Sequence, residues 1–382
     1  KGKRDVLQCN TPNFIERKNK RFTMSRKINT ALVGFGMTAK VMHAPFLATA
    51  ENYNVTTVVE RHKQDSKSIF PNANIVRSLE EALKNKEVEL VIITTPNDSH
   101  YTYAQQALQA GKHVVLEKPF TITSTDAAKL VQLAKEAAKV ISPFHNRRYV
   151  ADFRTMQQLL QQNLLGDVHT FEGHFDRYRP APKVNAWREE AIPGSGILYD
   201  LGPHLIDQAL CLFGLPKTIT ADVQKQRSFS VVDDAFDIKL DYGFLQVVLK
   251  SGMLVREPGP RYQIHGTLGS YVKWGEDVQE ALLKEGALPN VEGWGAEPAA
   301  QYGLLHTEKG GEVVKGQYPS LPGNFGLYYQ NLYNTLVHGA DLKEKGEHGY
   351  NTIKLIELAF ESSRQKRTLP CEDLMEATYP EN

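Results

Sequence analysis

A short apolar run that leads directly into a glycine-rich turn gives the firmest constraint on the fold of this 382-residue chain. Thr30-Ala-Leu-Val33 reads as a buried strand, and Gly34-Phe-Gly36-Met-Thr-Ala39 follows it as a turn that opens a helix. Gly34 permits the tight turn, Gly36 lets the backbone approach a phosphate, and alanine is an accepted third residue of the dinucleotide fingerprint. Free N–H groups at such a helix start bind a pyrophosphate. On the motif alone, an ordinary strand-to-helix turn explains these residues equally well.

The pattern continues beyond this turn. From Lys27 to Pro143, short apolar runs alternate with helical stretches, as repeated strand–helix units do. The predicted strands are Thr30–Val33, Val55–Val59, Ile75–Val76, Leu90–Thr94, His113–Leu116 and Val140–Ser142. Strands joined by short helices form a doubly wound parallel sheet, so we predict an α/β fold with a Rossmann domain over residues 27–146.

After Asn146 the pattern changes to strand-like alternation, broken by few helices. The predicted strands are His169–Tyr178, Ile219–Arg227, Phe236–Tyr242, Phe244–Lys250 and Arg261–His265. Helices are predicted over Val150–Asn163, Tyr328–His338 and Tyr350–Ser363, whereas 275–322 lacks periodicity and is predicted to be a functional or disordered loop. Residues 147–382 are therefore predicted to form an α+β domain with a large, mainly antiparallel sheet that serves substrate binding and oligomerisation. An uncovered apolar face of that sheet would require a partner, which predicts a homodimer or homotetramer.

Bulk composition excludes several classes of protein. The 45 Lys and Arg residues balance 44 Asp and Glu residues, which gives no electrostatic case for nucleic acid or a membrane surface. The three cysteines are too scattered for a metal site or a disulfide framework, which fits a cytoplasmic protein without a metal. No stretch reaches the ~18 consecutive apolar residues of a membrane span. Residues 1–26 are expected to be a disordered N-terminal extension, with a transit peptide as the alternative.

A second strand end carries a lysine suited to chemistry. Glu117-Lys118-Pro119 closes the predicted strand His113–Leu116. Ligands bind outside the carboxyl ends of parallel strands, so Lys118 is expected to project into the crevice that holds the dinucleotide. Burial and an oxidised nicotinamide ring would lower its pKa toward neutrality, and its ammonium would orient and polarise a reacting hydroxyl. The alternative is a solvated surface lysine.

Asp200 and His204 lie four residues apart around Leu-Gly-Pro. Pro203 predicts the first turn of a helix that Gly214 ends, which would place both side chains on one side. The helix dipole disfavours a protonated histidine there, and a neutral imidazole is suited to accepting a hydroxyl proton. The alternative is that Asp200 only caps the helix while His204 packs beneath it.

Glu60 and Arg61 end the second predicted strand, where the adenosine ribose is recognised, and they favour different cofactors. A carboxylate such as Glu60 holds the 2′-hydroxyl of NAD, whereas an arginine such as Arg61 accepts the 2′-phosphate of NADP. The sequence supplies both, so the choice between NAD and NADP stays open.

Taken together, these motifs resemble the Gfo/Idh/MocA oxidoreductases from Lys27 to the final helix. Further matching segments are Thr95-Pro96-Asn97-Asp-Ser-His100, His145-Asn-Arg-Arg148 and Gly196-Ile-Leu-Tyr-Asp-Leu-Gly-Pro-His204. The run Ala39–Pro45 and the segment Trp274–Trp294 are most similar to a subgroup near NADP-type scyllo-inositol dehydrogenase. The resemblance implies an NAD(P)-dependent dehydrogenase or reductase that transfers a hydride between nicotinamide and a secondary alcohol or ketone of a sugar, inositol or related polyol.

The resemblance also assigns residues to roles. It implies that Lys118, Asp200 and His204 are catalytic, and that Glu117 accepts a hydrogen bond from the nicotinamide ribose, unless it is a structural ion-pair partner. The full set expected to bind the cofactor is Gly34, Phe35, Gly36, Met37, Thr38, Ala39, Glu60, Arg61, Thr95, Pro96, Asn97, His100, Glu117 and Lys118. From their places beyond predicted strands, and in the catalytic helix, the residues expected to bind substrate are Asn146, Arg147, Tyr149, Asp176, Tyr178, Trp187, Asp200 and His204.

The same fold is also compatible with a non-catalytic function. A galactose-regulon repressor of yeasts resembles this family yet lacks a working catalytic set, so fold alone does not establish catalysis. The presence of Lys118, Asp200 and His204 together favours an enzyme over a ligand-sensing or dinucleotide-sensing regulator.

Overall fold

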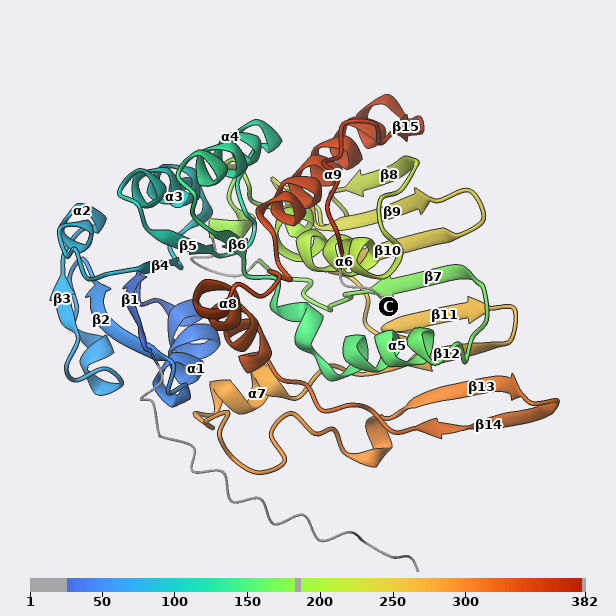
Figure 1. The fold of residues 1–382 in the computed structure, drawn as a ribbon. Helices are drawn as coiled ribbons and strands as arrows, with labels where there is room; N and C mark the ends of the chain where they lie inside the picture. Colours follow the sequence, from blue (N-terminus) through green and yellow to red (C-terminus); the bar gives the residue numbers. More distant parts are fainter. Residues whose placement is uncertain (1–25, 183–186, 380–382) are drawn as a thin grey trace, which may run out of the picture.

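The computed structural model describes residues 26–182 and 187–379, which form two β-sheets with helices packed around and between them (Figure 1). The expected N-terminal extension, except Arg26, lies outside the described residues.

The first sheet has six parallel strands in the order β3-β2-β1-β4-β5-β6. They are β1 (Ile28–Val33), β2 (Tyr53–Val59), β3 (Asn74–Val76), β4 (Leu90–Ile93), β5 (His113–Leu116) and β6 (Ile141–Pro143). All four residues of β4 are buried, as expected for a central strand covered on both faces. The predicted doubly wound sheet is confirmed, and the predicted strand ends are correct to within about two residues.

Helices cover both faces of this sheet. One face carries α1 (Ala44–Thr49), which continues the π-helical turn η1 (Ala39–His43), and α8 (Gly326–His338), as Figure 1 shows. The other face carries α3 (His100–Gln109) and α4 (Ser124–Glu136). The shorter elements are η2 (Asp65–Ser68), α2 (Leu79–Leu83) and η3 (Asn97–Ser99).

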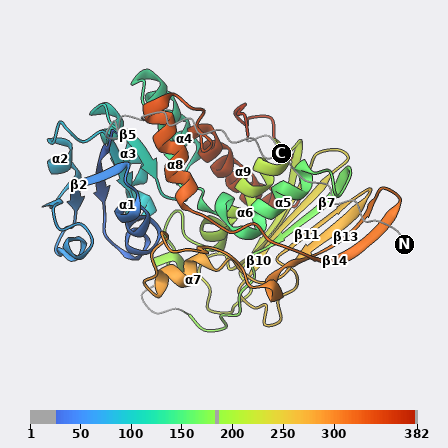
Figure 2. The same ribbon diagram turned by 60° about the horizontal axis from the view of Figure 1, so that its bottom comes forward.

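The second sheet has nine strands in the order β14-β13-β12-β11-β7-β10-β9-β8-β15, and only β7 and β10 pair in parallel. The strands are β7 (Val168–His174), β8 (Thr218–Gln224), β9 (Ala235–Asp241), β10 (Gln246–Gly252), β11 (Tyr262–Gly266), β12 (Gly269–Lys273), β13 (Gly303–Lys309), β14 (Glu312–Tyr318) and β15 (Leu369–Pro370). Figure 2 shows α5 (Ala151–Gln161), α6 (Ile197–Phe213) and α9 (Gly346–Gln365) on one face of this sheet. The predicted mainly antiparallel sheet is confirmed.

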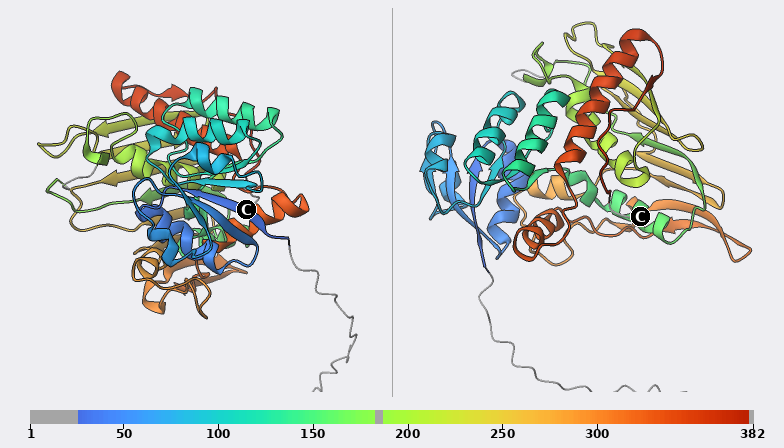
Figure 3. Two further views of the ribbon diagram at one scale, coloured as in Figure 1. Left: turned by 90° about the vertical axis from the view of Figure 1, so that its left-hand side faces the viewer. Right: turned by 45° about the horizontal axis from the view of Figure 1, so that its top comes forward.

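The opposite face of the second sheet carries no helix in the described part of the chain (Figure 3). We expected this face to be apolar, and that expectation is wrong. Glu172 and His174 alternate with buried residues along β7, and Lys250 of β10 forms an ion pair with Asp237 of β9 at 2.9 Å. The face is therefore largely polar, and apolar burial alone does not require a partner there.

The segment 275–322 is not the structureless loop that we predicted. It contains α7 (Gln279–Lys284), η6 (Ala299–Gln301) and the hairpin of β13 and β14. Six of the seven residues of β14 are exposed, so its sequence lacks the in-and-out alternation that marks a half-buried strand.

Helix α6 begins at Ile197, not at Pro203 as predicted, and Pro203 lies inside it. Its N-terminus is capped from another part of the chain, because Asp233 accepts hydrogen bonds from the backbone N–H of Ile197 and Leu198. No local sequence signal at Gly196 reveals such a distant cap. Gly214, at φ +75°, ends the helix as predicted.

A buried ion pair anchors α6 to the segment where the chain leaves the first sheet. The Arg148 guanidinium donates from Nε and Nη2 to both carboxylate oxygens of Asp207, at 2.8 and 2.6 Å. Nδ1 of His145 lies 2.5 Å from the same carboxylate, and Arg148 also donates to the carbonyl of Lys343. Burial opposes ionisation, but Arg148 and His145 hold the pKa of Asp207 well below its usual range.

This ion pair predicts a large stability effect. Arg148→Met leaves the Asp207 carboxylate buried without its main partner, so we expect the free energy of unfolding to fall by about 3–5 kcal/mol. Urea unfolding followed by tryptophan fluorescence measures this change. As a control, Arg364→Met removes an exposed pair with Glu361 and should cost less than ~1 kcal/mol. Equal decreases in the free energy of unfolding of the two variants would contradict the assignment of the Arg148–Asp207 pair as a major stabilising contact.

Candidate functional site

A cavity of about 380 Å³ lies where the carboxyl ends of β4 and β5 face α6 and the second sheet. Its walls include Thr95 after β4, Lys118 after β5, and both Asp200 and His204 of α6. The position obeys the rule that open parallel sheets bind ligands outside the carboxyl ends of their strands. The volume is in the range of small-molecule sites.

Lys118 connects the end of the first sheet to α6. Its Nζ lies 3.1 Å from Oδ1 of Asp200 and donates to the Asp200 carbonyl at 2.8 Å. The Lys118 ammonium therefore ties the end of β5 to the first turn of α6.

Asp200 is surrounded by cations. In addition to Lys118, Arg188 Nε lies 3.1 Å from Oδ1, and Arg177 Nη1 lies 3.6 Å from Oδ2. Although burial raises it, these three cations hold the pKa of Asp200 far below its usual range. Asp200 is therefore a carboxylate at neutral pH, shared among three positive charges.

His204 is a buried, neutral imidazole in the same wall. Burial lowers its pKa well below the usual value, and Lys118, Arg147, His145 and Arg177 lower it further. Its Nδ1 makes no hydrogen bond within the described residues. The expectation of a neutral imidazole therefore holds, although its cause is burial among cations more than the helix dipole.

Glu117 is held by a histidine that the sequence analysis did not select. Nε2 of His43 lies 2.7 Å from Oε1 of Glu117, and Nδ1 of His43 lies 2.6 Å from the Tyr329 hydroxyl. Oε2 of Glu117 accepts the backbone N–H of Lys118 at 3.0 Å. The ion-pair alternative for Glu117 is thus realised, with His43 instead of a lysine or arginine. Because each carboxylate oxygen has two lone pairs, Glu117 can still accept a bond from a ribose.

The loop after β4 lies against both neighbouring walls of the cavity. Asn97 donates to the carbonyl of Gly194 at 2.7 Å, close to the start of α6. The ring nitrogens of His100 lie 2.8 Å from the carbonyl of Pro119 and 3.0 Å from that of Thr95. Both side chains are buried and line the cavity.

The glycine turn after β1 has the features that a pyrophosphate requires. Gly34 has φ +92°, and a Cβ there would lie 3.1 Å from Oγ1 of Thr94. A Cβ on Gly36 would meet no atom within 4 Å, so open space faces this residue. Ala39 is fully buried and lets the following helix pack closely. These residues fit a dinucleotide whose phosphates lie at the helix start.

Glu60, which the sequence places where a ribose is recognised, uses its carboxylate to hold the turn η2. Its buried carboxylate accepts the backbone N–H groups of Asp65 and Ser66, both at 3.0 Å, and the Ser66 hydroxyl. It therefore caps the turn η2. Arg61, the next residue, is exposed.

The expected substrate-binding residues divide into two groups. Asn146, Arg147 and Asp176 line the cavity, as do Asp200 and His204. Two other expectations are wrong. The Tyr149 hydroxyl donates to buried Glu344 at 2.7 Å, outside the cavity lining.

Tyr178 stacks against Arg256, with the guanidinium carbon 4.1 Å from the ring centroid, and does not line the cavity either. The side chain of Trp187 lies outside the described residues.

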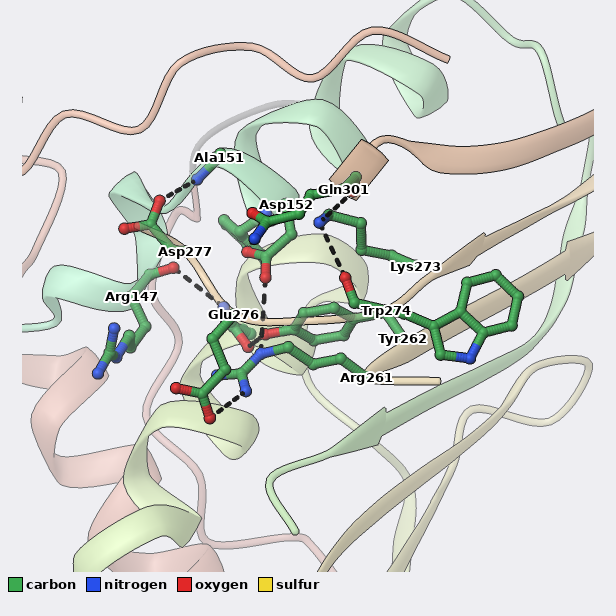
Figure 4. Close-up of polar contacts among 12 residues, drawn as sticks. Arg147, Ala151, Asp152, Arg261, Tyr262, Lys273, Trp274, Glu276, Asp277 and Gln301 are labelled. Carbon is green, nitrogen blue, oxygen red and sulfur yellow. Dashed lines mark hydrogen bonds and ion pairs between the residues drawn. The ribbon is translucent and has the colours of Figure 1, made fainter. Parts of the chain in front are cut away.

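Seven charged lining residues were missing from the candidate list: Arg177, Arg179, Arg188, Arg261, Glu276, Glu280 and Lys284. Arg261 lines the cavity, with its guanidinium carbon 3.9 Å from the Phe175 ring centroid. Figure 4 shows its contacts with two carboxylates. Its Nε lies 3.5 Å from Oδ2 of Asp152, and its Nη1 lies 3.3 Å from Oε1 of Glu276. The alternation Phe175-x-Arg177-x-Arg179 was a usable signal, because alternate residues of an extended segment share one side.

Two features are absent from the described ranges, 26–182 and 187–379. They contain no helix long and apolar enough to cross a membrane. They also contain no group of three or more His, Cys, Asp or Glu residues that could hold a metal ion.

Comparison with known proteins supplies the family. The sequence model of the oxidoreductase family with an NAD-binding Rossmann fold matches residues 28–145, and that of its C-terminal alpha/beta domain matches 157–371. A scyllo-inositol 2-dehydrogenase (NADP+) of Bacillus subtilis is 40% identical over 91% of this chain and 98% of its own length. A D-glucoside 3-dehydrogenase of Escherichia coli is 24% identical over 50% of this chain and 56% of its own length.

Solved structures agree with this result. An oxidoreductase from Bacillus subtilis superposes with a TM-score of 0.88 at 40% identity, covering 90% of this chain and 98% of that one. An oxidoreductase from Bacteroides fragilis superposes with a TM-score of 0.84 at 41% identity, covering 90% of this chain and 100% of that one. The chain is an oxidoreductase with an NAD(P)-binding Rossmann fold, and it belongs to the Gfo/Idh/MocA family.

Proposed function

We propose that this oxidoreductase transfers a hydride between NAD(P) and a secondary alcohol or ketone of a sugar, inositol or related polyol. The observation that carries the proposal is the meeting of Lys118, Asp200 and His204 around one cavity at the carboxyl ends of β4 and β5. The names of the relatives support the substrate class, because one acts on scyllo-inositol and another on D-glucosides.

Lys118 binds the reacting oxygen in this mechanism. Its ammonium is fixed by the carboxylate and the carbonyl of Asp200, and a third donor position remains for a substrate hydroxyl. A positive charge there lowers the pKa of the hydroxyl and stabilises an alkoxide as it forms.

His204 accepts the hydroxyl proton in oxidation and returns it in reduction. Burial keeps the imidazole neutral, which is the form that accepts a proton. Asp200 orients Lys118 and the arginines beside it, and its negative charge favours the imidazolium that forms on His204.

The cofactor supplies the hydride acceptor or donor when it is bound. The turn Gly34–Ala39 would hold its phosphates, and Asn97, His100 and Glu117, which line the cavity, would contact the nicotinamide end. Residues 27–146 form the cofactor domain, and 147–382 form the substrate domain. The expected homodimer or homotetramer, joined through the second domain, stays a proposal, because the open face of the second sheet is largely polar.

Cofactor preference gives one test. The Glu60 carboxylate is occupied by η2, whereas Arg61 is exposed, so we expect both cofactors to bind and NADPH to bind more tightly. Arg61→Ala should weaken NADPH about tenfold, ~1.4 kcal/mol, and NADH less than twofold. Fluorescence titrations measure both dissociation constants, with the exposed Lys86→Ala as a control for loss of one charge. Equal weakening of NADPH and NADH would contradict the assignment of Arg61.

The catalytic set gives a second test. Lys118→Ala or His204→Ala should each lower kcat by roughly 10²–10⁴-fold, because proton transfer and oxygen polarisation are lost. Asp200→Asn should lower kcat by a comparable or smaller factor. When the substitutions are combined, their effects on the activation free energy should be less than additive.

NADPH binding should survive in every variant, and Lys315→Ala on the exposed strand β14 should leave kcat unchanged. The assignment is wrong if folded, NADPH-binding Lys118→Ala turns over substrate at the wild-type rate.

A further inference from the structure

The cavity carries a surplus of positive charge. Its lining holds five arginines and two lysines against five carboxylates, although the whole chain has a formal net charge of only +1. One of those carboxylates, Glu117, is already paired with His43. The surplus is therefore a local property of this cavity.

Two carboxylates in the cavity are shared by five of these cations. Asp200 has Lys118, Arg177 and Arg188 around it. Glu280 has Arg147, at hydrogen-bond distance, and Lys284 at 2.7 Å. Although burial raises it, Arg147 and Lys284 lower the pKa of Glu280 to about 2.

The segment after β7 adds a cation, Arg179, for which the described residues provide no hydrogen-bond or ion-pair partner to the side chain. Arg177 and Arg179 both line the cavity, while Tyr178 between them does not, as extended geometry requires. Backbone bonds fix this segment: the N–H of Arg177 donates to Gly252 at 2.9 Å, and that of Arg179 donates to Met253 at 2.7 Å. The Arg179 side chain makes no hydrogen bond or ion pair within the described part of the chain.

The cofactor phosphates do not account for this charge. Of the turn Gly34–Ala39, which fits the pyrophosphate, only Thr38 reaches the cavity lining, and Arg61 does not reach it. An oxidised nicotinamide ring beside Lys118 would add a further positive charge. An anionic group on the substrate would neutralise Arg177 and Arg179.

We infer that the substrate is an anionic polyol or sugar, whose carboxylate or phosphate binds between Arg177 and Arg179 while its reacting hydroxyl binds at Lys118 and His204. Arginine is suited to this task because its planar fork of N–H donors matches the geometry of both oxyanions. This inference rests on the proposed function and narrows its substrate class from polyols in general to acidic ones.

An anion at this position also favours the proposed chemistry. The cations that surround His204 lower its pKa, which makes the imidazole a weak base in the absence of a ligand. A bound carboxylate or phosphate offsets these cations and raises the basicity of His204. Neutral polyols bring no such compensation.

Binding to the NADPH complex tests the inference without hydride transfer, because an alcohol cannot be oxidised there. Nicotinamide fluorescence is titrated with glucitol, gluconate and glucitol 6-phosphate, and separately with inorganic phosphate. We expect gluconate, glucitol 6-phosphate or both to bind at least tenfold more tightly than glucitol, ~1.4 kcal/mol. Comparison of gluconate with glucitol 6-phosphate shows whether the arginines prefer a carboxylate or a phosphate.

Arg179→Met should reduce this preference to about threefold, ~0.7 kcal/mol. Arg256→Met removes a nearby cation that does not line the cavity, and it should leave the preference unchanged. The inference is overturned if glucitol binds as tightly as both anions, or if no anion, including phosphate, perturbs the signal.

A separate oxidation assay with NADP⁺ distinguishes the two proposals. Oxidation of neutral polyols without preference for anions overturns the inference and leaves the proposed function intact. Tight binding of anions without oxidation of any bound alcohol supports the charge argument and contradicts the proposed function.

Discussion

The pair between Arg148 and Asp207 is the contact on which the site depends. It fixes helix α6, which carries Asp200 and His204, to the short segment where the chain leaves the first sheet. Lys118, at the end of β5, meets α6 from the other side at 2.8 and 3.1 Å. A buried, bidentate pair with additional hydrogen bonds has few alternative geometries. It therefore fixes the position of α6 relative to the end of the first sheet, the two walls of the cavity.

Electrostatics then determines what each group in the cavity can do. Shared cations keep Asp200 ionised, and burial among those cations keeps His204 neutral. We propose that the same imbalance of charge also selects the ligand. A site with more arginine and lysine side chains than carboxylates would be completed by an anion, so the protonation states of the catalytic groups and the proposed substrate class would have a common cause.

The features that the sequence predicted are those set by local patterns. The strand–turn–helix at Gly34 and the strand end at Lys118 follow from a few adjacent residues, and both were assigned correctly in the fold. The start of α6 depends on Asp233, which is distant in sequence, so Pro203 gave the wrong boundary. Glu60 was read as a ribose ligand because its position is right, but its carboxylate is used by the backbone of η2. Arg261 was missed because its stacking on Phe175 depends on tertiary structure alone.

The central claim is that Lys118, Asp200 and His204 act on one substrate carbon beside the nicotinamide. The most direct measurement uses NADPH carrying deuterium at C4 with a ketone that perturbs the cofactor fluorescence. NMR of the product then locates the label. The account predicts deuterium on the new carbinol carbon with the wild-type protein, and formation of the labelled product roughly 10²–10⁴-fold more slowly with Lys118→Ala. A ketone that binds beside the cofactor, yet takes up no deuterium from either face of the nicotinamide, would contradict it and favour a sensor.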